Sequence, residues 1–143
     1  MRKLILTAAA SLAMLAVTAT TGMAASLVAK IDVSEQTMTV TKYGRVVHRW
    51  KVSTARRGYV TPRGTYRPTR MHTMWYSRKY HMSPMPHSIF FRGGYAIHGT
   101  NAIRNLGRPA SHGCVRLHPE NARKLFSMVK RVGPGNVRIV VTN

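Results

Sequence analysis

Alternating apolar and polar residues in the first part of the chain restrict its fold more than any other feature. Every second residue from Leu27 to Val33 is apolar, and Met38 and Val40 repeat the pattern after a turn at 34–36. After a further turn at Gly44-Arg45, one face is predicted to carry Val46, His48, Trp50 and Val52. A period of two is typical of strands with one buried face. These segments are therefore predicted to form a β-meander.

The rest of the chain adds further short strands. Residues 55–87 are interrupted by six glycines and prolines in all, at 58, 62, 64, 68, 84 and 86. We therefore expect irregular structure there, apart from one strand near Gly64–Arg67. Strands are also predicted at Ser88–Phe91 and Tyr95–His98, around a turn, and at Val137–Val141 near the end of the chain.

One helix is predicted, beginning at Pro119, a residue that suits the first helical position. Its carboxyl end is marked by Gly133-Pro134. The predicted apolar stripe consists of Ala122, Leu125, Phe126, Val129 and Val132. The fold class expected from these patterns is mainly β, in one domain, with one principal helix.

The N-terminal residues have the composition of a secretory signal peptide. Arg2 and Lys3 precede an apolar run from Leu4 to Ala19, and small residues lead up to Ala24. We expect cleavage after Ala24, which divides the chain into a signal peptide at 1–24 and a domain at 25–143. The alternative is an uncleaved membrane anchor, for which the apolar run is short. Export to the periplasm is the expected outcome.

The charge is strongly unbalanced, because 23 Lys and Arg face three carboxylates, giving a net charge of +20. Those carboxylates are Asp32, Glu35 and Glu120, and they are too few for an acidic cluster. Three carboxylates do not supply the clustered acids that paired-carboxylate glycosidases, two-magnesium phosphotransferases and calcium sites need. The excess of cations predicts attraction to anionic polymers of the wall or outer membrane rather than recognition of a nucleic-acid sequence.

Cys114 is the single cysteine, and its surroundings predict a reactive thiol. A thiol must lose its proton to attack, and an imidazole such as His98 is the usual acceptor. Arginines nearby are expected to favour the thiolate. Gly113 lets the backbone approach closely, so that N–H groups can face a developing oxyanion. No carboxylate is close in sequence to orient the imidazole, so we expect the Gly99 carbonyl to do so.

This segment resembles the L,D-transpeptidase (YkuD-type) catalytic domains of bacterial cell-wall enzymes. His98 is followed by twelve residues and then by Ser-His-Gly-Cys-Val-Arg at 111–116, as in the family signature. Residues 61–66, Thr-Pro-Arg-Gly-Thr-Tyr, are also similar to a family stretch that precedes the site. The resemblance covers residues 26–142. It implies a β-sandwich or barrel with its principal helix after the catalytic cysteine.

The resemblance also implies the roles of the site residues and the reaction. Cys114 is the expected nucleophile, His98 the base, and Gly99 the residue that orients the base. The expected oxyanion hole consists of backbone amides of His112, Gly113 and Cys114, and the expected substrate-binding residues are Ser111 and Arg116. The family acts on peptidoglycan stem peptides, releasing D-alanine and passing the acyl group to an amine, with no cofactor or metal.

Three alternatives stay open from the sequence. With water as acceptor, the same site would be an L,D-carboxypeptidase. A non-enzymatic role as a cationic wall-binding or polyanion-binding module would explain the charge alone. Zinc ligation by His98, His112, Cys114 and His118 is the third, although their spacing matches no standard zinc pattern.

Overall fold

The computed structural model describes residues 24–143, so the predicted signal peptide lies outside the described residues except for its last residue. Nine strands, one α-helix and three short 3₁₀ helices make up the described chain. In order they are β1 (Leu27–Asp32), β2 (Thr37–Lys42), β3 (Arg45–Lys51), β4 (Gly64–Tyr66), β5 (Arg70–Ser77), η1 (Arg78–Tyr80), β6 (Ser83–Arg92), β7 (Tyr95–Gly99), η2 (Ile103–Asn105), β8 (Val115–Leu117), α1 (Pro119–Val132), η3 (Pro134–Asn136) and β9 (Val137–Thr142). The fold class is mainly β with one principal helix, as predicted.

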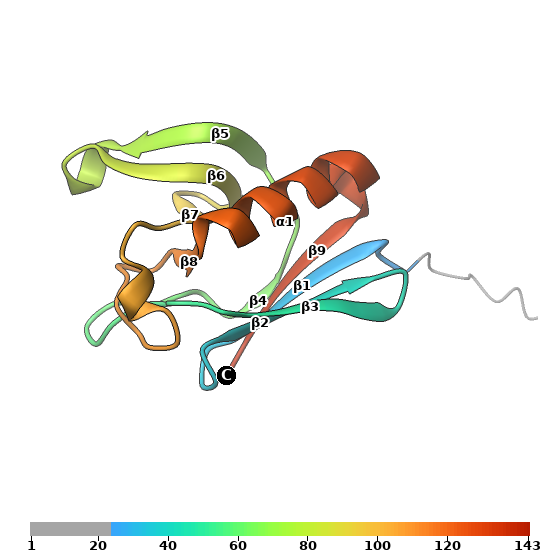
Figure 1. Cartoon of the computed structure of the whole chain (residues 1–143), viewed down its shortest axis with the longest axis horizontal. Helices are drawn as coiled ribbons and strands as arrows, with labels where there is room; N and C mark the ends of the chain where they lie inside the picture. The colour runs from blue at the N-terminus through green and yellow to red at the C-terminus, as the bar shows by residue number, and fades with distance from the viewer. Residues whose placement is uncertain (1–23) are drawn as a thin grey trace, which may run out of the picture.

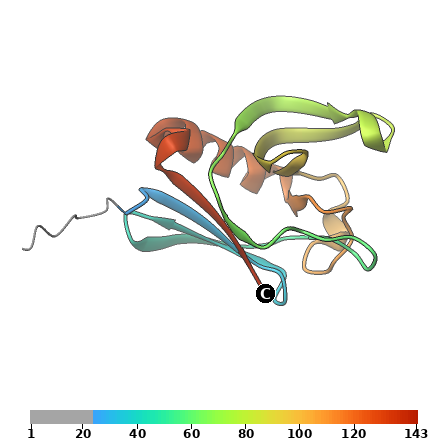
Figure 2. The ribbon, with the colours of Figure 1, turned by 180° about the vertical axis from the view of Figure 1, so that it is seen from behind.

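Two sheets and the helix form the domain (Figure 1). The five-stranded sheet has the order β3-β2-β1-β9-β4, with the predicted meander at one side and β9 parallel to β1. The four-stranded sheet has the order β5-β6-β7-β8, with β7 and β8 parallel. Between β3 and β5 the chain crosses the back of the molecule, where β4 pairs with β9 (Figure 2).

One hydrophobic core joins both sheets to α1. The alternating apolar residues of β1, β2 and β9 are buried, and the helix buries the predicted stripe except for its last member, Val132, which is partly buried. The helix begins at Pro119 and ends before Gly133, as predicted. Within residues 24–143, no helix has the length and apolar character needed to cross a membrane.

The position of Val46 differs from the prediction. A β-bulge between β2 and β3 pairs Val40 with His48 but Thr41 with Val46. Residues paired across strands share a face of the sheet, so the extra residue moves Val46 to the opposite face from His48. Val46 is 54% exposed instead of buried.

The prediction of irregular structure across residues 70–87 is wrong. The long strands β5 and β6 pair there as an antiparallel hairpin. Pro84 and Pro86 lie in the part of β6 that has β5 on one side only, because pairing with β7 begins at Ile89. A strand tolerates proline where no second neighbour needs the missing N–H.

Gln36 is a buried residue in the predicted turn between β1 and β2. Its side-chain amide donates to the Val33 carbonyl at 2.7 Å and to Thr54 Oγ1 at 2.6 Å. Its carbonyl oxygen accepts from the Thr54 backbone N–H at 3.0 Å. Gln36 therefore anchors the chain that follows β3 to the first turn of the domain.

Gln36→Leu is expected to lower the free energy of unfolding by about 2 kcal/mol, because it leaves the buried Thr54 N–H without an acceptor. Urea denaturation of the variant and the parent protein measures the difference. Glu35→Gln, at the exposed neighbouring position, is the matched control and should change stability by less than about 0.5 kcal/mol. Equal denaturation midpoints for Gln36→Leu and the parent would contradict the anchoring role.

Candidate active site

Parallel pairing of β7 with β8 brings the predicted cysteine and histidine to one face of the four-stranded sheet. Ile97 is paired with Val115, and His98 with Arg116. Successive side chains of a strand point to opposite faces. Ile97 and Val115 are buried in the core, so His98, Arg116 and the preceding Cys114 share the other face. Residues 100–114 connect the two strands and contain η2.

The orientation of His98 matches the sequence expectation. Its Nδ1–H donates to the Gly99 carbonyl at 2.7 Å, and since a carbonyl can only accept, Nδ1 carries the proton. Nε2 is therefore the unprotonated nitrogen and is able to accept a proton. Gly99 packs so closely against the start of α1 that a Cβ would lie 3.2 Å from Pro119 Cα. A side chain at residue 99 would therefore crowd the start of the helix, at the position that orients the imidazole.

His98 and Cys114 are both neutral in the resting site. Burial lowers the pKa of His98 to about 4, and the charge of Arg116 acts in the same direction, against the hydrogen bond to Gly99. Burial raises the pKa of the Cys114 thiol, and this outweighs the Ala96 N–H and Arg116, which lower it. The expectation that arginines make Cys114 a thiolate is therefore not met, because desolvation is the larger effect.

The loop before Cys114 is held by the hydroxyl of Ser111. Ser111 is fully buried; its Oγ donates to the Cys114 carbonyl at 2.6 Å and accepts from the Gly113 N–H at 3.0 Å. Gly113 has φ of +133°, and a Cβ there would lie 2.5 Å from Tyr95 Cε1. The shape of the loop thus requires both a hydroxyl at 111 and glycine at 113.

The three amides predicted as an oxyanion hole are in different situations. The Gly113 N–H is already bound to Ser111 Oγ. Among the described residues, no backbone or side-chain acceptor is bound by the N–H of His112 or of Cys114. These two N–H groups are the ones available to an incoming oxygen in this conformation.

Residues 54–61, which follow β3, hold the same loop through hydrogen bonds. Thr54 O accepts from the N–H groups of Ala110 and Ser111, and Arg56 N–H donates back to Ser111 O. Thr61 Oγ1 donates to the Gly113 carbonyl at 2.9 Å and accepts from the Ala55 N–H at 3.0 Å. Residue 61 belongs to the stretch 61–66 that resembles the family, but the sequence carries no signal for its contact with the Gly113 carbonyl.

Aromatic rings enclose the His112 side chain. The Tyr80 ring stacks on it with centroids 4.3 Å apart, and Tyr59 meets it edge-on at 4.7 Å. Arg56 Nη2 donates to His112 Nε2 at 3.0 Å, so this nitrogen is unprotonated. Burial, followed by the charges of Arg56, Arg116 and Lys79, lowers the pKa of His112. The η1 turn is thereby fastened to the loop that carries Cys114, a contact that no spacing in the sequence revealed.

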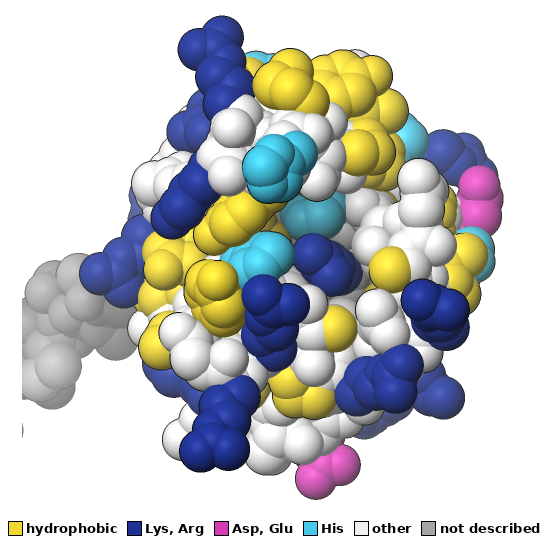
Figure 3. Space-filling model, turned by 90° about the vertical axis from the view of Figure 1, so that its left-hand side faces the viewer, with side chains coloured by type: hydrophobic (Ala, Val, Ile, Leu, Met, Phe, Trp, Pro, Cys, Tyr) yellow, Lys and Arg dark blue, Asp and Glu magenta, His cyan; other side chains and the backbone are white. Residues whose placement is uncertain are grey.

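A cavity of about 730 Å³ opens over this face of the sheet. Its wall contains His98, Cys114 and Arg116 beneath, and Trp75 and Tyr80 from the β5–β6 hairpin. Figure 3 views this end of the molecule, where histidine and cationic side chains surround a hollow. Arg116 is partly buried, and the ion pair found in the described residues, Arg123 with Glu120, does not involve it. The cavity therefore offers an anionic group an uncompensated guanidinium.

The zinc alternative finds no geometric support in the part of the chain that the structure describes. Among residues 24–143, no three His, Cys, Asp or Glu side chains come together as a metal site. His118 instead caps α1, where its Nδ1 accepts from the Glu120 N–H at 3.2 Å.

Comparisons with known sequences match this chain to L,D-transpeptidases. A family model described as the L,D-transpeptidase catalytic domain, YkuD, matches residues 26–141. Over 35 residues the chain is 57% identical to the probable L,D-transpeptidase YbiS of Escherichia coli strain K12. That stretch covers 24% of this chain and 11% of YbiS.

Solved structures share the fold. An L,D-transpeptidase from Mycobacterium smegmatis superimposes with a TM-score of 0.75 at 23% identity, covering 82% of this chain and 59% of that one. An L,D-transpeptidase from Stackebrandtia nassauensis gives a TM-score of 0.73 at 26% identity, covering 82% and 56%. This chain therefore spans little more than half the length of these two proteins.

The rate of Cys114 alkylation by iodoacetamide is expected to keep rising with pH into the alkaline range. The thiol pKa is raised by burial, and neutral His98 supplies no charge to stabilise a thiolate at neutral pH. Because the chain has one cysteine, the mass of the whole protein reports the reaction. A rate that is already constant below neutral pH would require a thiolate–imidazolium pair and would contradict the neutral resting site.

Proposed function

We propose that this chain is a cysteine acyltransferase that acts on peptidoglycan. The basis is that it belongs to the YkuD family of L,D-transpeptidase catalytic domains. The donor that the family resemblance implies is a stem tetrapeptide, cleaved between the diamino acid at its third position and the terminal D-alanine. The product would be a cross-link, an attached protein or an exchanged D-amino acid. Such reactions belong to peptidoglycan biosynthesis and cell-wall organisation, which maintain cell shape.

The observation that carries this proposal is the fixed tautomer of His98 on the same sheet face as Cys114. The Gly99 carbonyl holds the Nδ1–H, so Nε2 is left to take a proton. A base with a pKa of about 4 is unprotonated at neutral pH and is therefore ready to act. The nucleophile, the base and the group that orients the base all line or adjoin one cavity.

Acylation follows from this arrangement. Cys114 Sγ attacks the donor carbonyl carbon while its proton passes to His98 Nε2. The carbonyl oxygen becomes an oxyanion, for which the free N–H groups of His112 and Cys114 are the proposed donors. The tetrahedral intermediate then collapses, the C–N bond breaks, and the imidazolium returns the proton to the amine of D-alanine as it leaves. A thioester on Cys114 remains.

Because His98 and Cys114 are both neutral at rest, they become charged only during the reaction. Proton transfer creates a negative sulfur or oxygen and a positive imidazolium inside a partly buried site. Arg116, which has no carboxylate partner among the described residues, is placed to stabilise that negative charge or the carboxylate of the donor. Arg116 is therefore proposed to bind the substrate.

Ser111 is assigned a different role from the one expected. The family resemblance predicts that Ser111 binds substrate. In the structure, its buried hydroxyl donates one hydrogen bond and accepts another, and both partners lie within the loop. We propose that Ser111 is a positioning residue, which sets the direction of the N–H groups that follow it.

Deacylation reverses the proton path. An amine attacks the thioester carbonyl, gives its proton to His98, and the C–S bond breaks as Cys114 regains a proton. Water in place of the amine would make the product a free tripeptide, as in the carboxypeptidase alternative. Both acceptors use the same groups, so D-alanine release reports the first half of the reaction in either case.

The proposed location is the periplasm. The basic start at Arg2 and Lys3, the apolar run to Ala19 and the small residues before Ala25 support export and cleavage. Peptidoglycan stem peptides would be met there. Cleavage removes Arg2 and Lys3, so the net charge falls from +20 to +18, and this charge supports attraction to anionic polymers of the wall or outer membrane.

Cys114→Ala should abolish D-alanine release from a disaccharide-tetrapeptide, because no other group in the cavity is a thiol. Circular dichroism should show the fold retained, since the change removes one sulfur atom from a partly buried position. Excess chelator should leave the rate of the parent protein unchanged. Release by the variant at the parent's rate would exclude the thioester route, and loss of activity with chelator would revive the metal alternative.

Ser111→Ala is expected to lower kcat for D-alanine release about tenfold or more with little change in KM, because the Gly113 N–H and the Cys114 carbonyl lose their shared partner. Ser111→Thr keeps the hydroxyl and should restore most of the loss. A fall in both variants alike, or a rise in KM with kcat unchanged, would place Ser111 in direct contact with substrate instead.

A further inference from the structure

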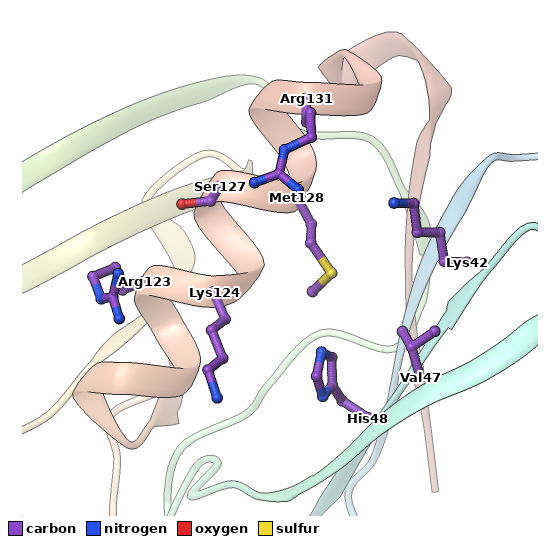
Figure 4. Close-up of a pocket in the computed structure, with 8 residues that line it drawn as sticks. All are labelled: Lys42, Val47, His48, Arg123, Lys124, Ser127, Met128 and Arg131. Atoms are coloured by element: carbon purple, nitrogen blue, oxygen red, sulfur yellow. The ribbon is translucent and has the colours of Figure 1, made fainter.

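A second groove lies between α1 and the β2–β3 hairpin and shares no lining residue with the Cys114 cavity. Its volume is about 420 Å³. In Figure 4, Met128 points from the helix toward the strands, where Val47 and His48 stand opposite it. Arg131 and Lys124 extend from α1 at different heights along the helix, and Lys42 lies across the groove on the strand side. The groove thus has an apolar floor and a cationic border.

The adjoining hairpin carries exposed apolar side chains. Tyr43, in the turn, is 70% exposed, and Val46 and Val47 are 54% and 42% exposed. The β-bulge after Val40 explains why the two valines are exposed. It turns Val46 to the face of the sheet opposite His48, and Val47 is the extra residue of the bulge. Among the described residues, these three are not part of either buried cluster.

One carboxylate adjoins the groove, because Arg123 lines it and is paired with Glu120. Asp32 and Glu35 adjoin the β1–β2 turn, at the other end of the antiparallel strands from Tyr43. Glu120 is in the first turn of α1 and is paired with Arg123 at 2.8 Å. Among the described residues, Lys42, Lys124 and Arg131 have no carboxylate partner, so these three keep their attraction for anions.

We propose that Lys42, Tyr43, Val47, Lys124 and Arg131 form a docking face for a bilayer of anionic phospholipid. Cations near such a surface attract its phosphates, and apolar side chains gain by entering the region between headgroups and acyl chains. A soluble polyanion would satisfy the cations but would leave Tyr43 and Val47 in water. The combination of both side-chain types favours the lipid surface.

The place of the docking face in the fold suits this role. The Tyr43 N–H donates to the Ser26 carbonyl at 2.9 Å, so the hairpin turn lies where the described chain begins. Figure 1 shows this end opposite the loops that precede β8. A domain resting on a membrane by this face would present the Cys114 cavity away from the lipid. This inference goes beyond the proposed function and does not depend on it.

Vesicle co-sedimentation tests the cationic part. The protein is the chain from Ala25, which contains every element and the whole core described above. With vesicles of equal parts phosphatidylglycerol and phosphatidylcholine, the triple variant K42Q/K124Q/R131Q should bind at least about tenfold more weakly than the parent. The matched variant R57Q/R104Q/R108Q removes the same charge from the loops near the other end and should lose much less. Equal losses would mean uniform attraction and would overturn the docking face.

A second pair of variants tests the apolar part at constant charge. Y43S/V47S should weaken binding to the same vesicles about tenfold, whereas the control Y76S/I103S, at exposed positions elsewhere, should not. Binding to inorganic polyphosphate should be equal in both pairs. If Y43S/V47S bound vesicles like the parent while the triple variant lost polyphosphate and vesicles alike, the partner would be a soluble polyanion and the lipid proposal would fail. D-alanine release from soluble substrate, measured in all variants, keeps this outcome separate from the proposed function.

Discussion

The site depends on one buried hydroxyl. Ser111 Oγ binds the Gly113 N–H and the Cys114 carbonyl at once, and so bends the chain into the loop that presents the cysteine. Thr61 fixes the Gly113 carbonyl from the other side. Gly113 is required because a side chain there would overlap Tyr95. The direction of Cys114, and of the N–H groups proposed to meet an oxyanion, follows from these contacts.

Burial then decides the electrostatics of the site. It keeps His98 unprotonated and Cys114 protonated, although Arg116 alone would favour the thiolate. In the proposed mechanism, charge separation therefore accompanies the attack on the substrate instead of preceding it. The Gly99 carbonyl takes the place that an acidic residue holds in many catalytic triads, which suits a chain with three carboxylates, all of them elsewhere.

Sequence patterns predicted β1, β2, α1 and β9 well, because each has a strong period and clear end signals. They misplaced Val46, since a bulge leaves no mark in an alternating pattern. They also missed β5 and much of β6, because prolines usually interrupt strands and only the pairing shows which neighbours are absent. In the site, the motif pointed to Cys114 and His98. The supports from Gln36, Thr54 and Tyr80 could not be predicted, because they join segments far apart in the chain.

In the proposed reaction, Cys114 carries the acyl group between donor and acceptor. This can be measured as the intact mass of the protein mixed with a disaccharide-tetrapeptide, without an amine acceptor, and stopped in acid. The expected added mass equals the donor minus D-alanine, is located on the peptide that contains Cys114, and is removed by hydroxylamine. Release of D-alanine while the protein mass stays unchanged at every time would contradict it.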